Sequence, residues 1–350
     1  MSSDFLLTCP TPITQREEIL LGHGSGGKLT SRLIEQTIVP ALRNPLLELL
    51  DDQAFVPIDG AGEVAITTDS FVVTPIFFPG SDIGELAVNG TINDLAMGGA
   101  RPLSLSLALV LEEGLALRDL ERILASVRRA ADRAGVSVVT GDTKVVGRGN
   151  ADKIFITTTG IGVRIPGVRL SSQRVRPGDV ILLSGTIGDH GMAILTTREG
   201  LEVTGDLVSD TAPLHDLART MIEAEPDIHA MRDPTRGGLA ATLVEIAERR
   251  AVGVEIDEAR IPVRPSVRGA CELFGLDPLF VANEGKLVAF VPEESVEVVL
   301  AAMRAHPLGA EATAIGRVTS THPGVVLAQT PIGGHRAVDL PYAEALPRIC

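Results

Sequence analysis

The segment VAITTDSFVV, residues 64–73, decides the fold, because it predicts a β-strand at the start of a strand–helix unit. It is short and rich in β-branched residues, as strands are. The helix that follows is capped by Ser81-Asp82 and ends near Met97. Asp69 interrupts the strand and Asp94 lies among apolar residues of the helix. A carboxylate in either place is costly unless it is paired or bound to a cation.

Four further elements extend this half of the chain: strands at 103–110, 136–139 and 154–163, and an amphipathic helix at 118–134. The strand at 136–139 runs into the polar sequence TGDTK, residues 140–144. The order β-α-β-α-β-β predicts an α/β or α+β domain of about 140 residues. We place this domain at 21–164, after a lead-in at 1–20.

A second α/β domain is predicted after a polar hinge at 164–178 that contains proline and glycine. Its main elements are a strand at 180–184 and helices at 192–198, 213–224 and 239–250, followed by short alternating strands and helices up to residue 327. The sequence NEGK, residues 283–286, is expected inside an apolar strand pair. We place this domain at 165–332 and expect a flexible tail at 333–350.

The composition argues against several classes of partner. The 350 residues carry a formal net charge of −14 and include no Trp and one Tyr, so binding to a nucleic-acid backbone or to stacked bases is not expected. No stretch has the length and apolarity of a membrane span, and the first ten residues lack the pattern of a secretion signal. Cys9, Cys271 and Cys350 are odd in number and lack CxxC spacing, which favours reduced thiols in the cytoplasm.

Residues 22–30, GHGSGGKLT, form a glycine-rich segment. Its glycines and lysine are spaced as in a P-loop, but Leu29 stands where Ser or Thr should bind magnesium, so we do not interpret it as one. Small residues and a lysine can still surround an anion with backbone N–H groups, whereas the alternative is a flexible linker. The phosphate-binding candidates are Gly24, Ser25, Gly26, Gly27 and Lys28.

Acidic residues recur in similar settings, each next to an apolar run or a glycine. They are Asp51, Asp52, Asp69, Asp94, Asp142 and, in the second half, Asp233. Several carboxylates and phosphate oxygens make the oxygen shell that Mg²⁺ prefers. Any one of them could instead be a helix cap or a surface residue. Together with the glycine-rich segment they predict a Mg-nucleotide site, with Asp69, Asp94 and Asp142 converging on the phosphates.

The chain ends in Pro347-Arg348-Ile349-Cys350, which puts a thiol and a carboxylate on one chain end. Prenylation requires a cysteine four residues from the end, and that position is proline. The two remaining interpretations are an exposed thiol without a role and an arm that carries a substrate on Cys350. A tail extended from Gly333 would reach roughly 60 Å. We expect an inward and an outward tail state, with ATP favouring the inward one.

Together these stretches resemble the HypE family of hydrogenase maturation proteins, in the superfamily of aminoimidazole ribonucleotide synthetase and selenophosphate synthetase. The resemblance extends over nearly the whole chain and is carried by residues 22–29, 67–100, 140–145, 233–239, 283–286 and 347–350. It implies a PurM-like fold, with an N-terminal ATP-binding and dimerisation domain, a C-terminal α/β domain and a mobile tail. A homodimer is the corresponding expectation.

The resemblance also implies an activity. Members of this family accept a carbamoyl group on the C-terminal cysteine from a HypF-type carbamoyltransferase, and they use ATP to dehydrate it to a thiocyanate. The cyanide then passes to iron held by a HypC–HypD complex and becomes part of the [NiFe]-hydrogenase centre. The expected cofactors are ATP and Mg²⁺.

Matched position by position, the resemblance implies roles for individual residues. Cys350 would be the acceptor, with Lys144 and Glu284 as catalytic residues beside it. Glu284 in an apolar strand could have the raised pKa of a base, and Lys144 could stabilise charge on the oxygen; the sequence does not assign the base. The metal ligands would be Asp52, Asp69, Asp94 and Asp233, with Asp51 as the alternative to Asp52, and the nucleotide contacts would include Gly141, Asp142 and Thr143.

Two other functions fit the same fold. One is a selenophosphate synthetase or a purine-type ATP-dependent ligase, and the other is a scaffold that binds nucleotide without catalysis. Selenophosphate synthetases carry Cys or selenocysteine in the glycine-rich segment, whereas residues 22–28 contain neither. Of these functions, only the dehydratase requires the thiol of Cys350.

Overall fold

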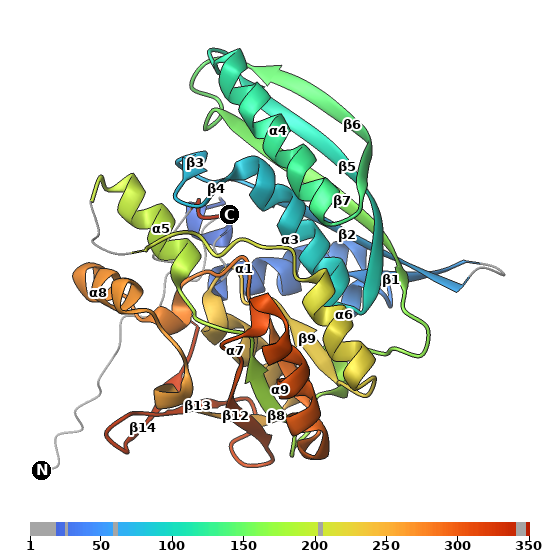
Figure 1. Cartoon of the computed structure of the whole chain (residues 1–350), viewed down its shortest axis with the longest axis vertical. Helices are drawn as coiled ribbons and strands as arrows, with labels where there is room; N and C mark the ends of the chain where they lie inside the picture. Colours follow the sequence, from blue (N-terminus) through green and yellow to red (C-terminus); the bar gives the residue numbers. More distant parts are fainter. Residues whose placement is uncertain (1–18, 25–26, 59–61, 202–205, 341–347) are drawn as a thin grey trace, which may run out of the picture.

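The computed structural model describes residues 19–24, 27–58, 62–201, 206–340 and 348–350. Each half of the chain is built on one large β-sheet with helices packed against it (Figure 1). The strands of the first half are β1 (Ala54–Ile58), β2 (Gly62–Phe71), β3 (Phe77–Phe78), β4 (Ser81–Asp82), β5 (Ala100–Glu112), β6 (Ser137–Val146) and β7 (Ile154–Arg164). Its helices are α1 (Lys28–Leu33), α2 (Val39–Leu42), α3 (Ile83–Met97) and α4 (Leu117–Arg133).

The sheet of the first half has the strand order β1-β2-β7-β5-β6. Its pairs are antiparallel except β5–β6, which is parallel. Helices α3 and α4 cover one face, so the odd-numbered residues of β2, such as Ala65 and Phe71, are buried there. The even-numbered residues Ile66, Thr68 and Ser70 are exposed on the other face. The described part of this chain therefore covers one face of the sheet and leaves the other open.

Helix α3 begins as the sequence predicts. The Asp82 carboxylate accepts hydrogen bonds from the backbone N–H groups of Gly84 (2.9 Å) and Glu85 (3.2 Å), which would otherwise lack partners in the first turn. The helix is buried on nearly all sides, because the sheet lies on one side and the second half of the chain on the other. It therefore brings Asp94 to the junction of the two halves.

Strand β6 differs from the expectation of a short, buried strand at 136–139 that runs into a polar sequence. It continues through residues 140–144 in parallel register with β5, and nearly all of its residues are exposed. Gly141 allows this pairing, because a Cβ there would lie 2.1 Å from the Leu107 carbonyl oxygen. Since β6 is an edge strand, polar residues in it remain solvated, and the polar sequence does not have to form a turn.

The strands of the second half are β8 (Val180–Leu183), β9 (Ala230–Arg232), β10 (Gly253–Asp257), β11 (Val288–Val291), β12 (Thr313–Thr319), β13 (Val326–Gln329) and β14 (His335–Val338). Its helices are α5 (Asp189–Arg198), α6 (His215–Ala224), α7 (Gly238–Arg250), α8 (Pro265–Phe274) and α9 (Val296–Ala305). The sheet order is β14-β13-β10-β12-β8-β11-β9, with α7 on one face and α6 and α9 on the other. Strands β8 and β11 are continuous apolar runs because both of their faces are buried.

Three local expectations are wrong. Residues 283–286 form a connection before β11 and are not part of a strand. Residues 335–338, which were expected to belong to a flexible tail, form β14 and pair with β13. The third concerns residues 29–50, where the sequence predicts a helix broken at Pro40, whereas the helical segment runs through Pro40 to Leu42. A π-helical turn at Ile34–Ile38 links α1 to α2 and accommodates the missing N–H of Pro40.

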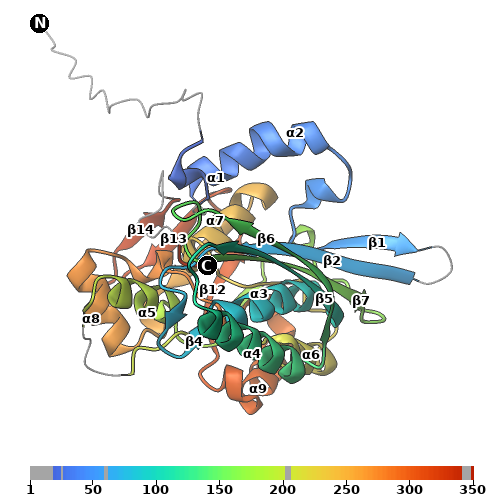
Figure 2. The same cartoon turned by 90° about the horizontal axis from the view of Figure 1, so that it is seen from above.

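The helical segment from α1 to α2 lies on the outside of the second half, next to α7 (Figure 2). Its Lys28 forms an ion pair with Asp339, which follows β14 (2.5 Å). Within the described residues, no helix combines the length and the apolar character that a membrane span requires.

Candidate active site

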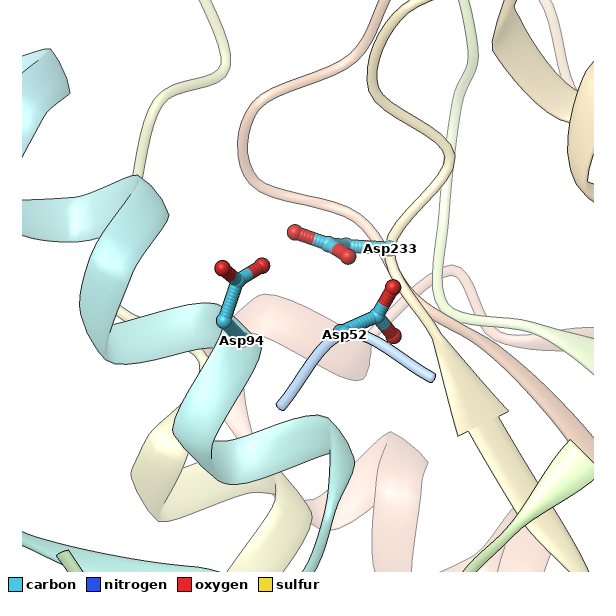
Figure 3. A group of neighbouring side chains, drawn as sticks. All are labelled: Asp52, Asp94 and Asp233. Atoms are coloured by element: carbon cyan, nitrogen blue, oxygen red, sulfur yellow. The ribbon is translucent and has the colours of Figure 1, made fainter. Parts of the chain in front are cut away.

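Three carboxylates meet at the junction of the two halves. Asp52 precedes β1, Asp94 lies in α3 and Asp233 follows β9, and each offers a carboxylate oxygen within 4.8 Å of the other two. Figure 3 shows the three side chains turned toward one another. Asp233 is buried, and Asp52 and Asp94 are partly buried. Residues widely separated in sequence therefore build one acidic cluster.

A threonine and an arginine position this cluster. The Thr67 hydroxyl lies 2.6 Å from Asp94 Oδ2 and 2.9 Å from the backbone carbonyl oxygen of Asp52, so it can donate to either. Arg232 Nε lies 2.9 Å from Asp52 Oδ1. Burial acts to lower the pKa of Arg232, but Asp52 and neighbouring acids outweigh it, so the pKa lies above its usual value. This arginine is a permanent positive charge beside the cluster.

Burial and mutual repulsion disfavour the ionised form of the carboxylates in the cluster. Burial raises the pKa of Asp52 to about 8 and that of Asp233 to about 6. The pKa of Asp94 is also well above its usual value, because of burial and then of repulsion by Asp233, Asp69 and Asp52. Carboxylates this close to one another keep their protons unless a cation is bound.

Asp69 and Glu284 extend the cluster. Glu284 is only 2% exposed, and burial followed by repulsion from Asp233 and Asp69 raises its pKa well above the usual value. Burial also raises the pKa of Asp69, and Arg236 partly offsets this. Glu284 Oε1 and Asp52 Oδ2 are both buried without a hydrogen-bond partner among the described residues. Each of these oxygens has the capacity to accept a ligand.

The backbone around Glu284 is fixed tightly. Its N–H donates to Asp210 Oδ1 (3.1 Å), and its carbonyl accepts from the Asn93 side chain of α3 (3.3 Å). Asp210 also forms a buried ion pair with Lys286 (3.0 Å). Gly285 makes this approach possible, because a Cβ there would lie 1.8 Å from the Asp210 carbonyl oxygen. Lys286 thus forms its ion pair with Asp210.

The structure distinguishes Asp51 from Asp52. The Asp51 carboxylate accepts hydrogen bonds from the hydroxyls of Ser171 (2.8 Å) and Ser172 (2.5 Å), which link the two halves. It therefore faces away from the cluster, whereas Asp52 belongs to it. The metal-ligand candidate at this pair is Asp52.

The donor set fits a hard divalent cation. Mg²⁺ is bound by one or two carboxylates, with waters and phosphate oxygens completing its octahedron. The cluster offers Asp52, Asp94 and Asp233 within reach of one ion, and Asp69 close by. The unpartnered Asp52 Oδ2 and the raised carboxylate pKa values both indicate a cation-binding environment. ATP and Mg²⁺ as expected from the sequence are compatible with this geometry.

The end of the chain lies beside the end of β2, the strand that carries Asp69. The backbone N–H of Val72, directly after β2, donates to an oxygen of the Cys350 α-carboxylate (3.1 Å), and that of Thr74 donates to the carbonyl oxygen of Arg348 (3.2 Å). Ile349 is 2% exposed and Cys350 is partly buried. Residues 348–350 are therefore in an inward position, while residues 341–347 lie outside the described part of the chain.

Asp142 and Lys144 do not join the cluster in this chain. The register aligns Asp142 with Ala108 of β5, Ala108 with Thr157 of β7, and Thr157 with Ser70 of β2. Asp142 and Lys144 therefore project from the open face of the sheet, whereas Asp69 projects from the face that α3 covers. The two exposed side chains pair with each other (2.8 Å), and Lys144 lowers the pKa of Asp142.

The glycine-rich segment is only partly described. Gly24 is exposed, and its carbonyl oxygen accepts from Arg236 of the Asp233 loop (3.2 Å). Gly27 precedes α1 and is buried, and Lys28 is paired with Asp339. Ser25 and Gly26 lie outside the described residues, as does Cys9. Gly141 and Thr143 lie in β6 with Asp142. Nucleotide contacts by these residues stay a prediction.

Sequence reasoning missed three residues beside the site: Arg232, Asp210 and His190. Each gains a partner from a distant segment, which the local sequence does not indicate. Only the arginine offered a signal, because it immediately precedes Asp233.

The comparisons with known proteins agree with the fold. Residues 50–164 match the N-terminal domain of the AIR synthase related proteins, and residues 176–328 match the C-terminal domain of the same family. The chain is 55% identical over 328 residues to the carbamoyl dehydratase HypE of Azotobacter vinelandii, covering 94% of this chain and 96% of the relative.

Two solved structures are also similar. A hydrogenase maturation protein HypE in complex with ATP is 49% identical, with a TM-score of 0.80 and coverage of 95% of this chain and 100% of that one. A chain of a HypE–HypF complex is 45% identical, with a TM-score of 0.84 and coverage of 88% and 99%. The PurM-like fold expected from the sequence is confirmed. Given the similarity along nearly its whole length, the chain belongs to the HypE family of the AIR synthase related proteins.

Proposed function

We propose that this chain catalyses the ATP-dependent dehydration of a carbamoyl group carried on its own Cys350, converting the S-carboxamide to a thiocyanate. The observation that carries this proposal is the inward position of the chain end. Val72 donates its backbone N–H to the α-carboxylate of Cys350 and follows the strand that carries Asp69. The chain end that carries Cys350 is thus held by the immediate extension of the strand that carries Asp69, the carboxylate next to the cluster. The relatives named carbamoyl dehydratase, and the relative solved with ATP, support the same reaction.

The carboxylates would hold Mg²⁺ with the phosphates of ATP. Asp52, Asp94 and Asp233 would be the ligands, and Asp69 would contribute a further oxygen. The bound ion would neutralise charge on the transferring phosphoryl group. Arg232 keeps Asp52 oriented, and the Thr67 hydroxyl does the same for Asp94. Ordered supporting residues of this kind fix the ligands before the substrate arrives.

Glu284 is the best-supported base. In the reaction the carboxamide oxygen becomes phosphorylated and leaves as phosphate, while the nitrogen loses both of its protons. A carboxylate with a raised pKa and an unpartnered oxygen suits that proton transfer. Asp210 and Asn93 hold its backbone in place, so the carboxylate is presented from a fixed position.

Lys144 would act across a homodimer. It lies with Asp142 on the open face of the first-half sheet, which also exposes Ile66 and Ile161, paired residues of neighbouring strands. A second copy covering this face would remove apolar surface from water. It would also bring the Asp142 and Lys144 side chains of one copy toward the nucleotide and Cys350 of the other. In such a dimer Lys144 would lie near a substrate, which its position within a single chain does not allow.

The partners follow from the proposed reaction. A HypF-type carbamoyltransferase would load Cys350, as the relative solved in a HypE–HypF complex suggests. A HypC–HypD complex carrying iron would receive the cyanide for the [NiFe]-hydrogenase centre. We place these steps in the cytoplasm, in keeping with the reduced thiols expected from the cysteine pattern.

Mass spectrometry of the C-terminal peptide tests the function. The protein is incubated with a HypF-type carbamoyltransferase, carbamoyl phosphate and Mg²⁺, with and without ATP for the second step. We expect a carbamoyl adduct on Cys350 that becomes a cyano adduct only when ATP is available to this chain. Cys350→Ser should form neither. ATP turnover that proceeds unchanged without the thiol would instead indicate a ligase of the same fold.

A further inference from the structure

The docked chain end leaves one backbone carbonyl facing away from the strand that binds it. Val72 donates to the α-carboxylate of Cys350 and Thr74 donates to the carbonyl oxygen of Arg348, as alternate residues do in an antiparallel pair. The carbonyl of Ile349 between them points in the opposite direction. Because Ile349 is 2% exposed, that carbonyl needs a partner from the protein.

His190 of α5 supplies the partner. Its Nε2 lies 2.9 Å from the Ile349 carbonyl oxygen. The imidazole ring is fully buried and makes a T-shaped contact with Phe78, with an angle of 87° between the two ring planes. A carbonyl can only accept, so Nε2 must carry the proton. Burial lowers the pKa of His190, which keeps the imidazole neutral with a lone pair on Nδ1.

Ser209 fixes this tautomer. Its hydroxyl lies 2.8 Å from His190 Nδ1 and accepts a hydrogen bond from the backbone N–H of Thr211 (3.2 Å), so its own proton is available for Nδ1. Asp210, next in the chain, binds the backbone of Glu284 and pairs with Lys286. One short segment therefore connects the histidine that holds the chain end to the backbone that presents Glu284.

We propose that His190 is a positioning residue for the dehydration, which holds Cys350 at the end of β2 by donating Nε2–H to the Ile349 carbonyl. This rests on the proposed function for its purpose, although the hydrogen bond itself does not depend on it. The chain end leaves this position when the His190 bond, the bonds from Val72, Thr74 and Arg198, and the burial of Ile349 are lost together. His190 thus contributes to how much of the time Cys350 is available to partners and how much to its own site.

Alkylation of Cys350 by iodoacetamide, read from the mass of the C-terminal peptide, measures how often the end is released. His190→Leu fills the buried space with an apolar side chain and removes the hydrogen-bond donor. We expect Cys350 of this variant to be alkylated about 5-fold to 10-fold faster than that of the parent. His190→Gln keeps an N–H and should stay close to the parent rate. Thr196→Val is the matched control, because it removes a buried hydrogen bond of α5 that goes to Met192 within the helix. An unchanged alkylation rate in folded His190→Leu would overturn the proposal.

A second measurement does not depend on any histidine variant folding. Hydrogen–deuterium exchange at the imidazole Cε1 of each histidine can be followed by peptide mass. In the full chain carrying Ile349→Asp, which should expel the chain end, we expect His190 to exchange several-fold faster. His229 is equally buried but pairs with Asp179, so it should not change. Unchanged exchange at His190 would contradict the proposal.

These two readouts use neither ATP nor a carbamoyltransferase, so they stand or fall independently of the proposed function. The catalytic consequence is measured separately. With Cys350 already carbamoylated, His190→Leu should dehydrate it about 5-fold to 10-fold more slowly at saturating ATP, with the KM for ATP unchanged, and His190→Gln should restore the rate. Faster alkylation with a normal dehydration rate would show that His190 holds the chain end without serving the reaction, and would overturn the positioning role.

Discussion

The buried carboxylate cluster and the exposed pair on β6 differ in environment although their sequences look alike. Asp94 and Asp142 each lie in a polar interruption beside apolar residues. Asp94 is turned into the junction of the two halves, where burial and neighbouring acids raise its pKa well above the usual value. Asp142 projects from an exposed edge strand, where Lys144 and a backbone N–H lower its pKa. One environment favours binding of a cation and the other needs none.

The difference follows from which face of one sheet each residue occupies. Asp69 and Asp142 belong to strands of the same five-stranded sheet, but strand alternation sends them to opposite faces. Residues that the family resemblance places in one site are therefore separated by the sheet within a single chain. The proposed homodimer would bring Asp142 of one copy and Asp69 of the other to a single site.

The largest effect is expected for Asp94→Asn. The substitution removes one ligand from the cluster, so the affinity for Mg-ATP should fall by about 100-fold or more. Because Asp94 is a buried acid repelled by its neighbours, the metal-free protein should be as stable as the parent or more so. Calorimetric titration with Mg-ATP measures the affinity, and thermal unfolding without metal measures the stability. Unaltered affinity would remove Asp94 from the metal site.

A smaller loss is expected when a supporting group is removed. Thr67→Val keeps the shape of the side chain but removes the hydroxyl that lies within hydrogen-bond distance of the Asp94 carboxylate and the Asp52 carbonyl. Substitutions of this kind reduce metal affinity by about 10-fold to 100-fold. Thr68→Val is the matched control, because Thr68 faces the open side of the sheet and bonds Thr159. Equal effects of the two variants would contradict the account.

The cluster should also make stability depend on pH. The folded-state pKa values of Asp52, about 8, and Asp233, about 6, lie above the unfolded value of 3.8. Their contribution to stability is therefore full below the unfolded pKa and is lost as the pH rises through 6 to 8. We expect the Tm of the metal-free protein to fall by about 3 °C or more between pH 5.5 and pH 8.5. Saturating Mg²⁺ should reverse the fall, and a flat profile without metal would contradict the cluster.

The exposed pair should show the smallest effect on the fold. Asp142→Asn removes an ion pair between two solvated side chains, so the Tm should stay within about 1 °C of the parent. Dehydration of carbamoylated Cys350 should nevertheless slow, because Asp142 is proposed to face the nucleotide of the second copy. Thermal unfolding and the peptide-mass assay, run on the same sample, separate these outcomes. A large loss of stability would show that β6 has a structural role instead.

Much of the architecture was predictable from local patterns. The cap at Asp82, the strand that contains Asp69 and the paired domains all follow from periodicity and turn chemistry. The choice between Asp51 and Asp52 was not, because it depends on where Ser171 and Ser172 return to the junction. His190 was also beyond reach, since its partner is a backbone carbonyl 159 residues away. Nor could a polar stretch in β6 reveal that it pairs in register with β5.

Mixing of subunits tests the central claim most directly, namely that the buried cluster of one copy works with Lys144 of the other. Lys144→Ala and Glu284→Ala should each be carbamoylated on Cys350 and each fail to form thiocyanate. Co-refolded or co-expressed, they should recover about a quarter of the parental rate, since half of the dimers are mixed and each mixed dimer has one intact site. Absence of any recovery in verified mixed dimers, or full dehydration by either variant alone, would contradict it.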